Sequence, residues 1–230
     1  MVLAAGLGLR MRPLTLTNPK PLIPVAGRCM LDRALDHLAA AGLSRAVVNA
    51  HWLADRVRDH LAARPHDFPA GLSVLVEDEL LETGGGVANA LPLLGDRPFF
   101  VVNGDIVWTD GAVPALTRLA QAWDDAAMDA LLLLQPVETA VGYEGRGDFH
   151  LDPSGRPRRR DGETAPLVFA GVQLLHPRLF AGAPSGAFSL NLLYDRALGR
   201  ERLSGIIHDG GWYHVGTPDA LPQVEALLAS

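Results

Sequence analysis

The apolar positions in the first half of the chain form short continuous runs that alternate with stripes at helical spacing. Runs of strand length cover residues 1–5, 46–50, 72–76 and 99–102. Apolar side chains recur every three or four residues over 31–41 and 53–61, and each stripe is followed by a glycine or a proline. This alternation predicts a parallel sheet with helices packed on its faces.

The second half is less regular. Strand-like runs cover 130–135 and 167–175, and amphipathic stripes cover 113–123, 190–198 and a last helix ending at Ala229. We expect the segments 205–208 and 212–215 to pair with each other around two glycines, and the charged run 156–161 to form a solvated turn. A glycine-rich loop, 142–149, is expected to lead into a short strand. With no repeat or linker in view, the predicted fold is one α/β domain over 1–230. It would have a Rossmann-like, mixed but mostly parallel sheet, helices on both faces and a small accessory β region.

Composition limits the partners. The net charge of −6 argues against a nucleic-acid surface, and no apolar run reaches the length of a membrane span. No secretory signal is visible, and the single cysteine, Cys29, fits a reducing cytosol, so a cytoplasmic location is expected. A small anionic ligand in a local basic pocket remains compatible with this charge. The sequence carries no signal for the oligomeric state.

The turn after the first apolar run carries the clearest chemistry. Gly6 and Gly8 let the backbone approach a ligand closely, and successive N–H groups in such a turn can hold an anion. Arg10 and Lys20 follow and add cations suited to phosphates. The glycines alone fit an ordinary strand-to-helix turn equally well, because Met11 stands where a dinucleotide fingerprint has its third glycine and no Walker A sequence follows. The two cations favour a loop that binds a nucleotide's phosphates.

Two further segments could complete a nucleotide site. The segment Glu82-Thr83-Gly84-Gly85-Gly86 precedes a helix predicted to start at Val87. It is either a flexible loop or a place where backbone approaches a base or ribose, and we favour the second interpretation. Asp105 follows the buried run 99–102, so it would lie at the same sheet edge as Gly6. A carboxylate there could be a solvated turn residue, but the shared edge favours a metal ion or a ribose hydroxyl as its partner.

These motifs resemble those of a known family. The sequence Leu3-Ala4-Ala5-Gly6-x-Gly8-x-Arg10-Met11-x-Pro13-Leu14-Thr15, followed by Pro19-Lys20-Pro21-Leu22, is similar to the signature of sugar-1-phosphate nucleotidyltransferases. The resemblance covers essentially the whole chain. Within the family, 80–86 and 145–149 most resemble the N-acetylmuramate α-1-phosphate uridylyltransferases. The implied fold is the family's GT-A-like sheet, with a nucleotide-binding part over roughly 1–110 and a sugar-binding part over 111–230.

The resemblance implies a reaction and a set of roles. An oxygen of a sugar-1-phosphate attacks the α-phosphate of a nucleoside triphosphate, and pyrophosphate leaves. The expected substrates are UTP and N-acetylmuramic acid 1-phosphate, and the expected cofactor is Mg²⁺, with Mn²⁺ or Co²⁺ as alternatives. The implied catalytic residues are Arg10, Lys20 and Asp105, with Asp105 also the metal ligand. The implied nucleotide-binding residues are Ala4, Ala5, Gly6, Gly8, Glu82, Thr83, Gly84 and Gly85. The implied sugar-binding residues are Asn103, Asp148 and Gly171.

The chain departs from the family pattern at two places. His214 stands where most relatives carry an aspartate that is the second magnesium ligand, and imidazole suits a hard cation poorly. His214 could bind metal through water, favour manganese or cobalt, or leave Asp105 as the only protein ligand. A lysine that many relatives carry after the sugar loop is also missing, because Lys20 is the only lysine; one arginine of 158–160 could replace it. Two alternatives therefore stay open: guanylyl transfer to mannose-1-phosphate, and a nucleotide-sugar binding module with reduced catalysis.

Overall fold

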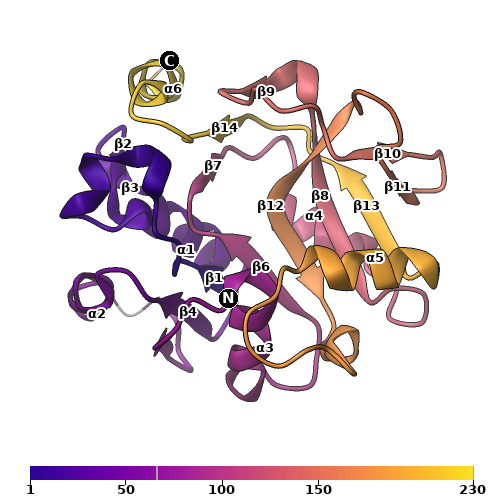
Figure 1. The fold of residues 1–230 in the computed structure, drawn as a ribbon, viewed down its shortest axis with the longest axis horizontal. Coiled ribbons are helices and arrows are strands. Elements are labelled where there is room, and N and C mark those ends of the chain that lie inside the picture. Colours follow the sequence, from indigo (N-terminus) through magenta and orange to yellow (C-terminus); the bar gives the residue numbers. More distant parts are fainter. Residues whose placement is uncertain (66, 230) are drawn as a thin grey trace.

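A mixed β-sheet forms the centre of the computed structural model, which describes residues 1–65 and 67–229 (Figure 1). Within this described part, nine strands join in the order β11-β10-β12-β6-β1-β4-β5, and β8 pairs with β12 and carries β13 on its other side. The strands of this sheet are β1 (Val2–Leu3), β4 (Ala46–Ala50), β5 (Leu72–Val76), β6 (Phe99–Asn103), β8 (Ala130–Pro136), β10 (Phe149–Leu151), β11 (Pro157–Arg159), β12 (Leu167–Leu175) and β13 (Leu203–Ile207).

The four adjoining strands β6, β1, β4 and β5 are parallel, as the alternation of strands and helices in the first half predicts. The direction changes at β12, which is antiparallel to both β6 and β8. In the parallel group, Leu3 lies in register with Asn49 on one side and Asn103 on the other. The carboxyl ends of three neighbouring strands therefore meet at one edge of the sheet, where open α/β sheets bind ligands.

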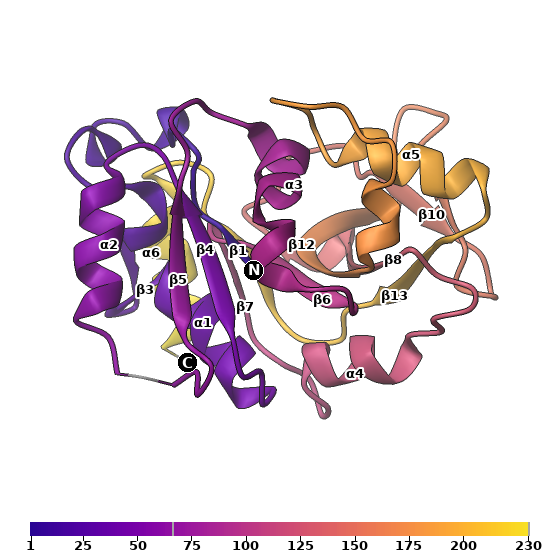
Figure 2. The same ribbon diagram turned by 90° about the horizontal axis from the view of Figure 1, so that it is seen from below.

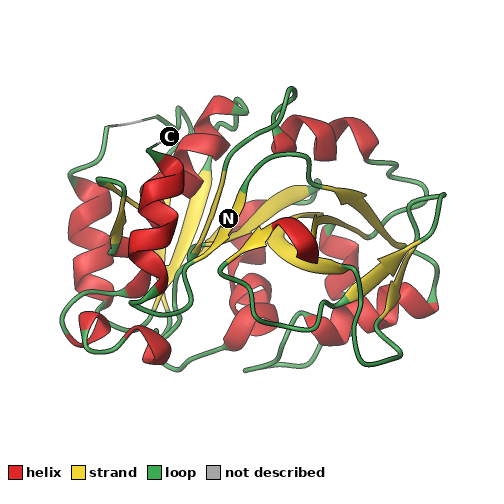
Figure 3. Cartoon of the chain, turned by 90° about the horizontal axis from the view of Figure 1, so that it is seen from above, coloured by secondary structure: helices red, strands yellow, loops and turns green. Residues whose placement is uncertain are grey.

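Helices cover both faces of the sheet (Figures 2 and 3). The α-helices are α1 (Met30–Ala40), α2 (Ala54–Ala62), α3 (Glu82–Leu94), α4 (Ala115–Ala122), α5 (Asn191–Gly199) and α6 (Ala220–Leu228). The short 3₁₀ segments are Leu9–Met11, Leu14–Leu16, Lys20–Leu22, Val137–Thr139 and Pro177–Phe180. Val48 and its neighbour Val47 point to opposite faces, so the first packs with α1, α2 and α4 and the second with α3 and α5. No helix in the described residues has the length and apolar character needed to cross a bilayer.

A smaller β region packs beside loop 4–11, which is predicted to bind phosphates and is named the phosphate loop for that prediction. It consists of β7 (Ile106–Trp108), β14 (Trp212–His214) and β9 (Ala140–Val141), with the short hairpin β2 (Pro24–Val25) and β3 (Arg28–Cys29) nearby. Met11 from the phosphate loop and Val107 from β7 share a buried cluster with Val215 and with Val224 of α6. The C-terminal helix therefore stabilises the N-terminal loop, and the accessory β region expected from sequence is present.

The expected pairing between 205–208 and 212–215 is wrong. Strand β13 runs parallel to β8, from Leu203 beside Ala130 to Ile207 beside Leu134, while β14 pairs with β7 and β9. The apolar run of β8 is buried, so its backbone N–H and C=O groups need hydrogen-bond partners along both edges of the strand. Strand β12 supplies these partners along one edge only. Gly205 lies within this pairing, where an added Cβ would lie 2.8 Å from Leu134 Cδ1 and would require that side chain to shift.

The charged run 156–161 is not wholly a solvated turn. Its residues Pro157–Arg159 form β11, an edge strand antiparallel to β10. The guanidinium of Arg159 lies 4.7 Å from the centre of the Phe149 ring and also donates to Asp195. Alternation gives the strand one side that packs and one that is solvated, so its charged residues do not prevent pairing.

The glycine triplet was predicted to precede a helix, but it lies inside one. Helix α3 begins at Glu82, and Gly84, Gly85 and Gly86 form its buried first turns. An added Cβ would lie 2.4 Å from the ring of Phe188 at Gly84 and 2.2 Å from the carbonyl oxygen of Gly186 at Gly85. Close packing against the segment before α5 offsets the helix-weakening cost of these glycines.

Candidate functional site

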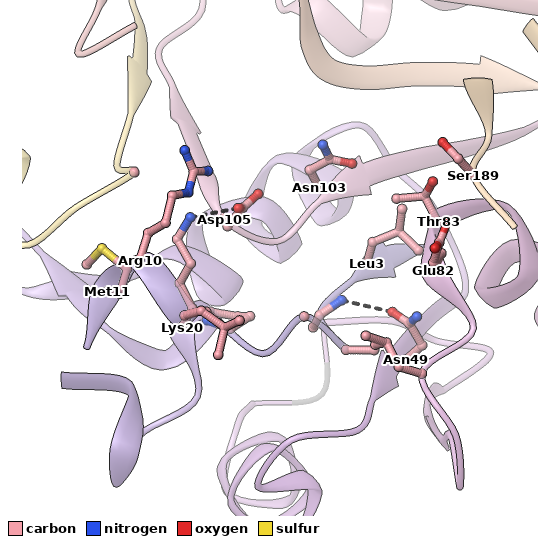
Figure 4. Close-up of a pocket in the computed structure, with 18 residues that line it drawn as sticks. Leu3, Arg10, Met11, Lys20, Asn49, Glu82, Thr83, Asn103, Asp105 and Ser189 are labelled. Atoms are coloured by element: carbon pink, nitrogen blue, oxygen red, sulfur yellow. Dashed lines mark hydrogen bonds and ion pairs between the residues drawn. The ribbon is translucent and has the colours of Figure 1, made fainter. Parts of the chain in front are cut away.

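A cavity of about 650 Å³ opens at the carboxyl ends of β1, β4 and β6 (Figure 4). The phosphate loop and its continuation line one part of it with Ala4, Ala5, Gly6, Gly8, Arg10 and Lys20. The remaining predicted residues that line it are Glu82, Thr83, Asn103 and Asp105. The structure therefore brings ten of the predicted site residues to one cavity, although they come from segments far apart in sequence.

The phosphate loop is held by contacts behind it. Gly8 has a φ of 62°, and an added Cβ would lie 2.8 Å from Thr15 Cγ2 and 3.0 Å from Lys20 Cβ, so both conformation and space require glycine. The hydroxyl of Thr15 donates to the carbonyl of Gly8 over 2.8 Å, and the indole of Trp52 donates to the carbonyl of Thr15 over 2.8 Å. These bonds fix the loop before a ligand arrives.

The strongest electrostatic feature is the pair formed by Lys20 and Asp105. The ammonium of Lys20 donates to a carboxylate oxygen of Asp105 over 2.7 Å, and the Lys20 side chain is only 8% exposed. Desolvation acts to raise the pKa of Asp105, but the charge and hydrogen bond of Lys20 outweigh it and hold the pKa below its ordinary value, with smaller contributions from His214 and Arg10. Arg10 is exposed and extends toward this pair (Figure 4). The site thus combines an ionised carboxylate with two cations.

His214 lies beside this cluster rather than in the cavity lining. Strand β14 places it opposite Ile106, the residue after Asp105, and its ring stacks on Trp212 at a centroid distance of 5.9 Å. Desolvation and the charge of Lys20 lower the pKa of His214, which keeps the imidazole neutral at pH 7. An added Cβ on Gly216, which does line the cavity, would lie 2.7 Å from its Nε2. A glycine there leaves room for the ring.

The other end of the cavity is formed by the start of α3. Glu82 has a φ of 58°, an uncommon conformation for a residue with a side chain, and it lies at the cavity with Thr83 and Ser189 (Figure 4). The hydroxyl of Thr83 accepts a hydrogen bond from the backbone of Leu190 over 3.0 Å. Gly84 and Gly85 face Phe188 and Gly186, and they are not among the lining residues.

Of the three residues expected to bind the sugar, only one lines the cavity. Asn103 lines the cavity, and Gly171 is adjacent to it: an added Cβ on Gly171 would lie 3.1 Å from Asn103 Nδ2. Gly171 has a φ of 77° and lies where the pairing of β12 with β8 shifts register. Asp148 is outside the lining and accepts a hydrogen bond from Phe169 N–H over 3.0 Å, which ties the glycine-rich loop to β12.

The three arginines considered as a replacement for the missing lysine have other partners. Arg158 pairs with Asp161, and Arg159 with Asp195. Arg160 donates to the carbonyl of Gly147, within the glycine-rich loop. None of the three lines the cavity.

Eight lining residues are absent from the predicted site: Leu3, Leu9, Met11, Pro21, Asn49, Leu80, Ser189 and Gly216. Asn49 carried a usable signal, because it is the one polar residue in the apolar run 46–50. Ser189 carried none, since it reaches the cavity only through the packing of its segment on α3. Gly216 likewise reaches the cavity only through tertiary structure.

A different group of possible metal ligands lies away from the cavity. In the described residues, ligand atoms of Cys29, Asp32 and His60 lie within 4.8 Å of one another. However, Arg64 donates to Asp32 over 2.7 Å, and burial raises the pKa of the Cys29 thiol to about 12. A protonated thiol and a carboxylate already paired with a guanidinium do not favour a cation. Asp105, which is ionised and opens to the cavity, suits a hard cation better.

Known proteins resemble this chain in sequence and in fold. Residues 1–145 match the family described as Nucleotidyl transferase. The N-acetylmuramate alpha-1-phosphate uridylyltransferase of Caulobacter vibrioides is 45% identical, over 100% of this chain and 96% of its own length, and that of Neisseria meningitidis is 38% identical, over 100% and 98%. The inositol-1-phosphate CTP transferase of T. maritima shares the fold, with a TM-score of 0.80 at 17% identity over 99% of this chain and 93% of its own. The chain therefore belongs to the nucleotidyl transferase family.

Proposed function

We propose that this chain transfers a uridylyl group from UTP to N-acetylmuramate α-1-phosphate and releases pyrophosphate. The observation that carries the proposal is the Lys20–Asp105 pair inside a cavity bounded by a phosphate loop on one side and Asn103 on the other. Two relatives matched over 96% and 98% of their length carry the same name, which supports this nucleotide and this sugar. Guanylyl transfer to mannose-1-phosphate is the alternative that an experiment has to separate.

The triphosphate is proposed to lie along the backbone from Ala4 to Gly8. The N–H groups of this turn supply partial positive charge, and Arg10 neutralises the pyrophosphate as it leaves. Lys20 contacts the α-phosphate or the incoming sugar phosphate, and Asp105 holds it in place over 2.7 Å. Glu82 and Thr83 lie at the base or ribose, at the far end of the cavity.

The reaction needs positioning and charge neutralisation more than proton transfer. An oxygen of the sugar phosphate forms a bond to the α-phosphorus, the bond from that phosphorus to the bridging oxygen breaks, and pyrophosphate departs with the electron pair. Both reactants are anions, so cations that hold them in line lower the barrier. Asn103 is proposed to orient the sugar, with Gly171 leaving space for it. Asp148 acts from a distance, by fixing the glycine-rich loop to β12.

A divalent cation fits the residues present. Lys20 takes one carboxylate oxygen of Asp105, so the other is available to a cation, and Mg²⁺ bound to nucleotide typically uses only one or two protein carboxylates. When bound there, Mg²⁺ would neutralise phosphate charge. His214, with its neutral ring beside Asp105, is proposed as an outer-sphere neighbour that contacts the ion through water.

A pyrophosphate-release screen tests the function. Each nucleoside triphosphate is combined with N-acetylmuramate α-1-phosphate, N-acetylglucosamine-1-phosphate, glucose-1-phosphate and mannose-1-phosphate. We expect the highest kcat/KM with UTP and the muramate. Release only with GTP and mannose-1-phosphate would replace the uridylyl assignment, and nucleotide binding without release under any metal would indicate a binding module.

The variant His214→Asp is expected to keep or increase activity with Mg²⁺. The substitution places a carboxylate beside Asp105, and carboxylate oxygens suit magnesium better than imidazole does. Rates measured with Mg²⁺, Mn²⁺ and Co²⁺ should show the ratio of magnesium to cobalt activity rising in the variant.

His214→Leu is the matched control, because it removes the ring without adding an oxygen ligand and should not raise that ratio. If His214→Asp abolishes activity with all three metals while the variant stays folded, His214 has a positive role of its own. Its assignment as an outer-sphere neighbour would then be wrong.

A further inference from the structure

A buried line of hydrogen bonds joins the phosphate loop to the start of α3. The backbone N–H of Ala4 donates to Asn49 Oδ1 over 2.8 Å, and Asn49 Nδ2 donates to Glu77 Oε1 over 2.7 Å. The backbone N–H of Leu81 donates to the other carboxylate oxygen of Glu77 over 3.1 Å. Asn49 and Glu77 are 2% and 3% exposed. Figure 4 shows the first of these bonds beneath the cavity.

The polarity of this line is fixed by its ends. Both ends are backbone donors, so Asn49 must turn its oxygen to Ala4 and its nitrogen to Glu77. Glu77 must then accept at both oxygens, which a carboxylate can do and a glutamine amide cannot. Gly86 leaves room for the arrangement: an added Cβ would lie 2.8 Å from Asn49 Nδ2 and 2.9 Å from Glu77 Oε1. The third glycine of the triplet thus makes space for the hydrogen bonds.

These hydrogen bonds also place the buried negative charge on Glu77, at the α3 end. Glu77 follows β5 and bonds to the residue before α3, a helix of 13 residues whose N-terminal dipole stabilises an anion. Under the phosphate loop lies the neutral amide of Asn49. A carboxylate at that position would face phosphate anions in a site of low dielectric, where like charges repel strongly.

We propose that Asn49 and Glu77 are positioning residues of the nucleotide site, an inference that rests on the proposed function. They set the phosphate loop at a fixed place relative to the α3 residues Glu82 and Thr83, so that the two ends of the nucleotide are held in register. They also keep the buried charge at the α3 end, away from the triphosphate.

The test uses Asn49→Asp, Glu77→Gln and the double variant. Each single variant leaves a mismatch: two acceptors face each other in Asn49→Asp, and two donors face each other in Glu77→Gln. In the double variant, the new carboxylate at position 49 accepts from Ala4 and from the new amide at position 77, whose oxygen accepts from Leu81. Every hydrogen bond is restored, with the charge moved to the phosphate end.

We expect both single variants to lower the melting temperature and the double variant to recover most of the loss. The KM for UTP should nevertheless be higher in the double variant than in the wild type, by roughly tenfold. The KM for the sugar phosphate should stay close to wild type. A merely structural role would restore KM together with stability.

Three outcomes overturn parts of the inference in distinguishable ways. If the double variant is no more stable than the single variants, the hydrogen-bond polarity is wrong. If it recovers both stability and the KM for UTP, the claim about charge is wrong. If wild-type protein shows no turnover of UTP, the proposed function fails, and calorimetric titration with UTP and the melting temperatures still test the positioning role.

Discussion

Asp105→Asn is expected to lower kcat by about three orders of magnitude or more, similar to the loss of a strong charge-stabilising group in other enzymes. The substitution preserves shape but removes the charge that orients Lys20 and would hold the metal. Lys20 can still donate to the new amide oxygen, so the free energy of unfolding should fall by roughly 1–3 kcal/mol rather than by the full cost of an unpaired buried charge. Steady-state pyrophosphate release and thermal unfolding, measured on the same preparation, separate the two effects.

The pH dependence of this loss follows from electrostatics. Neighbouring cations hold the pKa of Asp105 below its ordinary value of 3.8, so the carboxylate of the wild type stays ionised from about pH 5 to pH 8. The ratio of wild-type to variant rates should therefore be nearly constant across that range. A ratio that fell steeply toward pH 5 would show that Asp105 titrates there, contrary to this assignment.

Asp161→Asn is the matched control for the aspartate. Its carboxylate pairs with Arg158, but the two side chains are 63% and 65% exposed and lie outside the cavity. Exposed pairs contribute little to stability, so both kcat and melting temperature should stay close to wild type. A comparable loss of activity in this control would indicate a general effect of removing a negative charge.

The positions of several strands depend on local hydrophobic patterns, so they can be predicted from the sequence. Strands β4, β5 and β12 occupy the predicted ranges because each is a bounded apolar run. Strand pairing is not local. Nothing in 203–207 specifies that it lies beside β8, whose paired residues are 130–134, rather than beside β14.

The same distinction applies to the site. The phosphate loop, Lys20 and Asp105 carry their chemistry in residue type and position, and the cavity contains all of them. The glycine triplet was wrongly predicted to precede the helix, because the reason for these glycines lies in a distant segment. Phe188 and Gly186 fill the space that side chains at Gly84 and Gly85 would need. The partnership of Asn49 and Glu77 is invisible in sequence for a similar reason, since it depends on the register of β4 and β5.

Lys20→Met is expected to lower kcat/KM by roughly three orders of magnitude, because it deletes a nearly buried cation while keeping an apolar side chain of similar length. The loss should also become pH-dependent. Lys20 is the largest cause that lowers the pKa of Asp105, so its removal raises that pKa and the residual activity should fall more steeply as the pH is lowered. Arg12→Met is the control: exposed Arg12 comes from the same segment but does not line the cavity.

Because Lys20 is the only lysine in the chain, its place in the site can also be tested without mutation. An amine-directed acylating reagent can modify one side chain only, and mass spectrometry of the peptide that carries Lys20 separates this from reaction at the N-terminus. Saturating UTP with Mg²⁺ should protect Lys20 from the reagent, and modification should abolish pyrophosphate release in proportion to its extent. Adenosine, which lacks the phosphates, should give no protection. Full modification of Lys20 with activity intact would remove it from the catalytic machinery, whatever the effect of the Lys20→Met substitution.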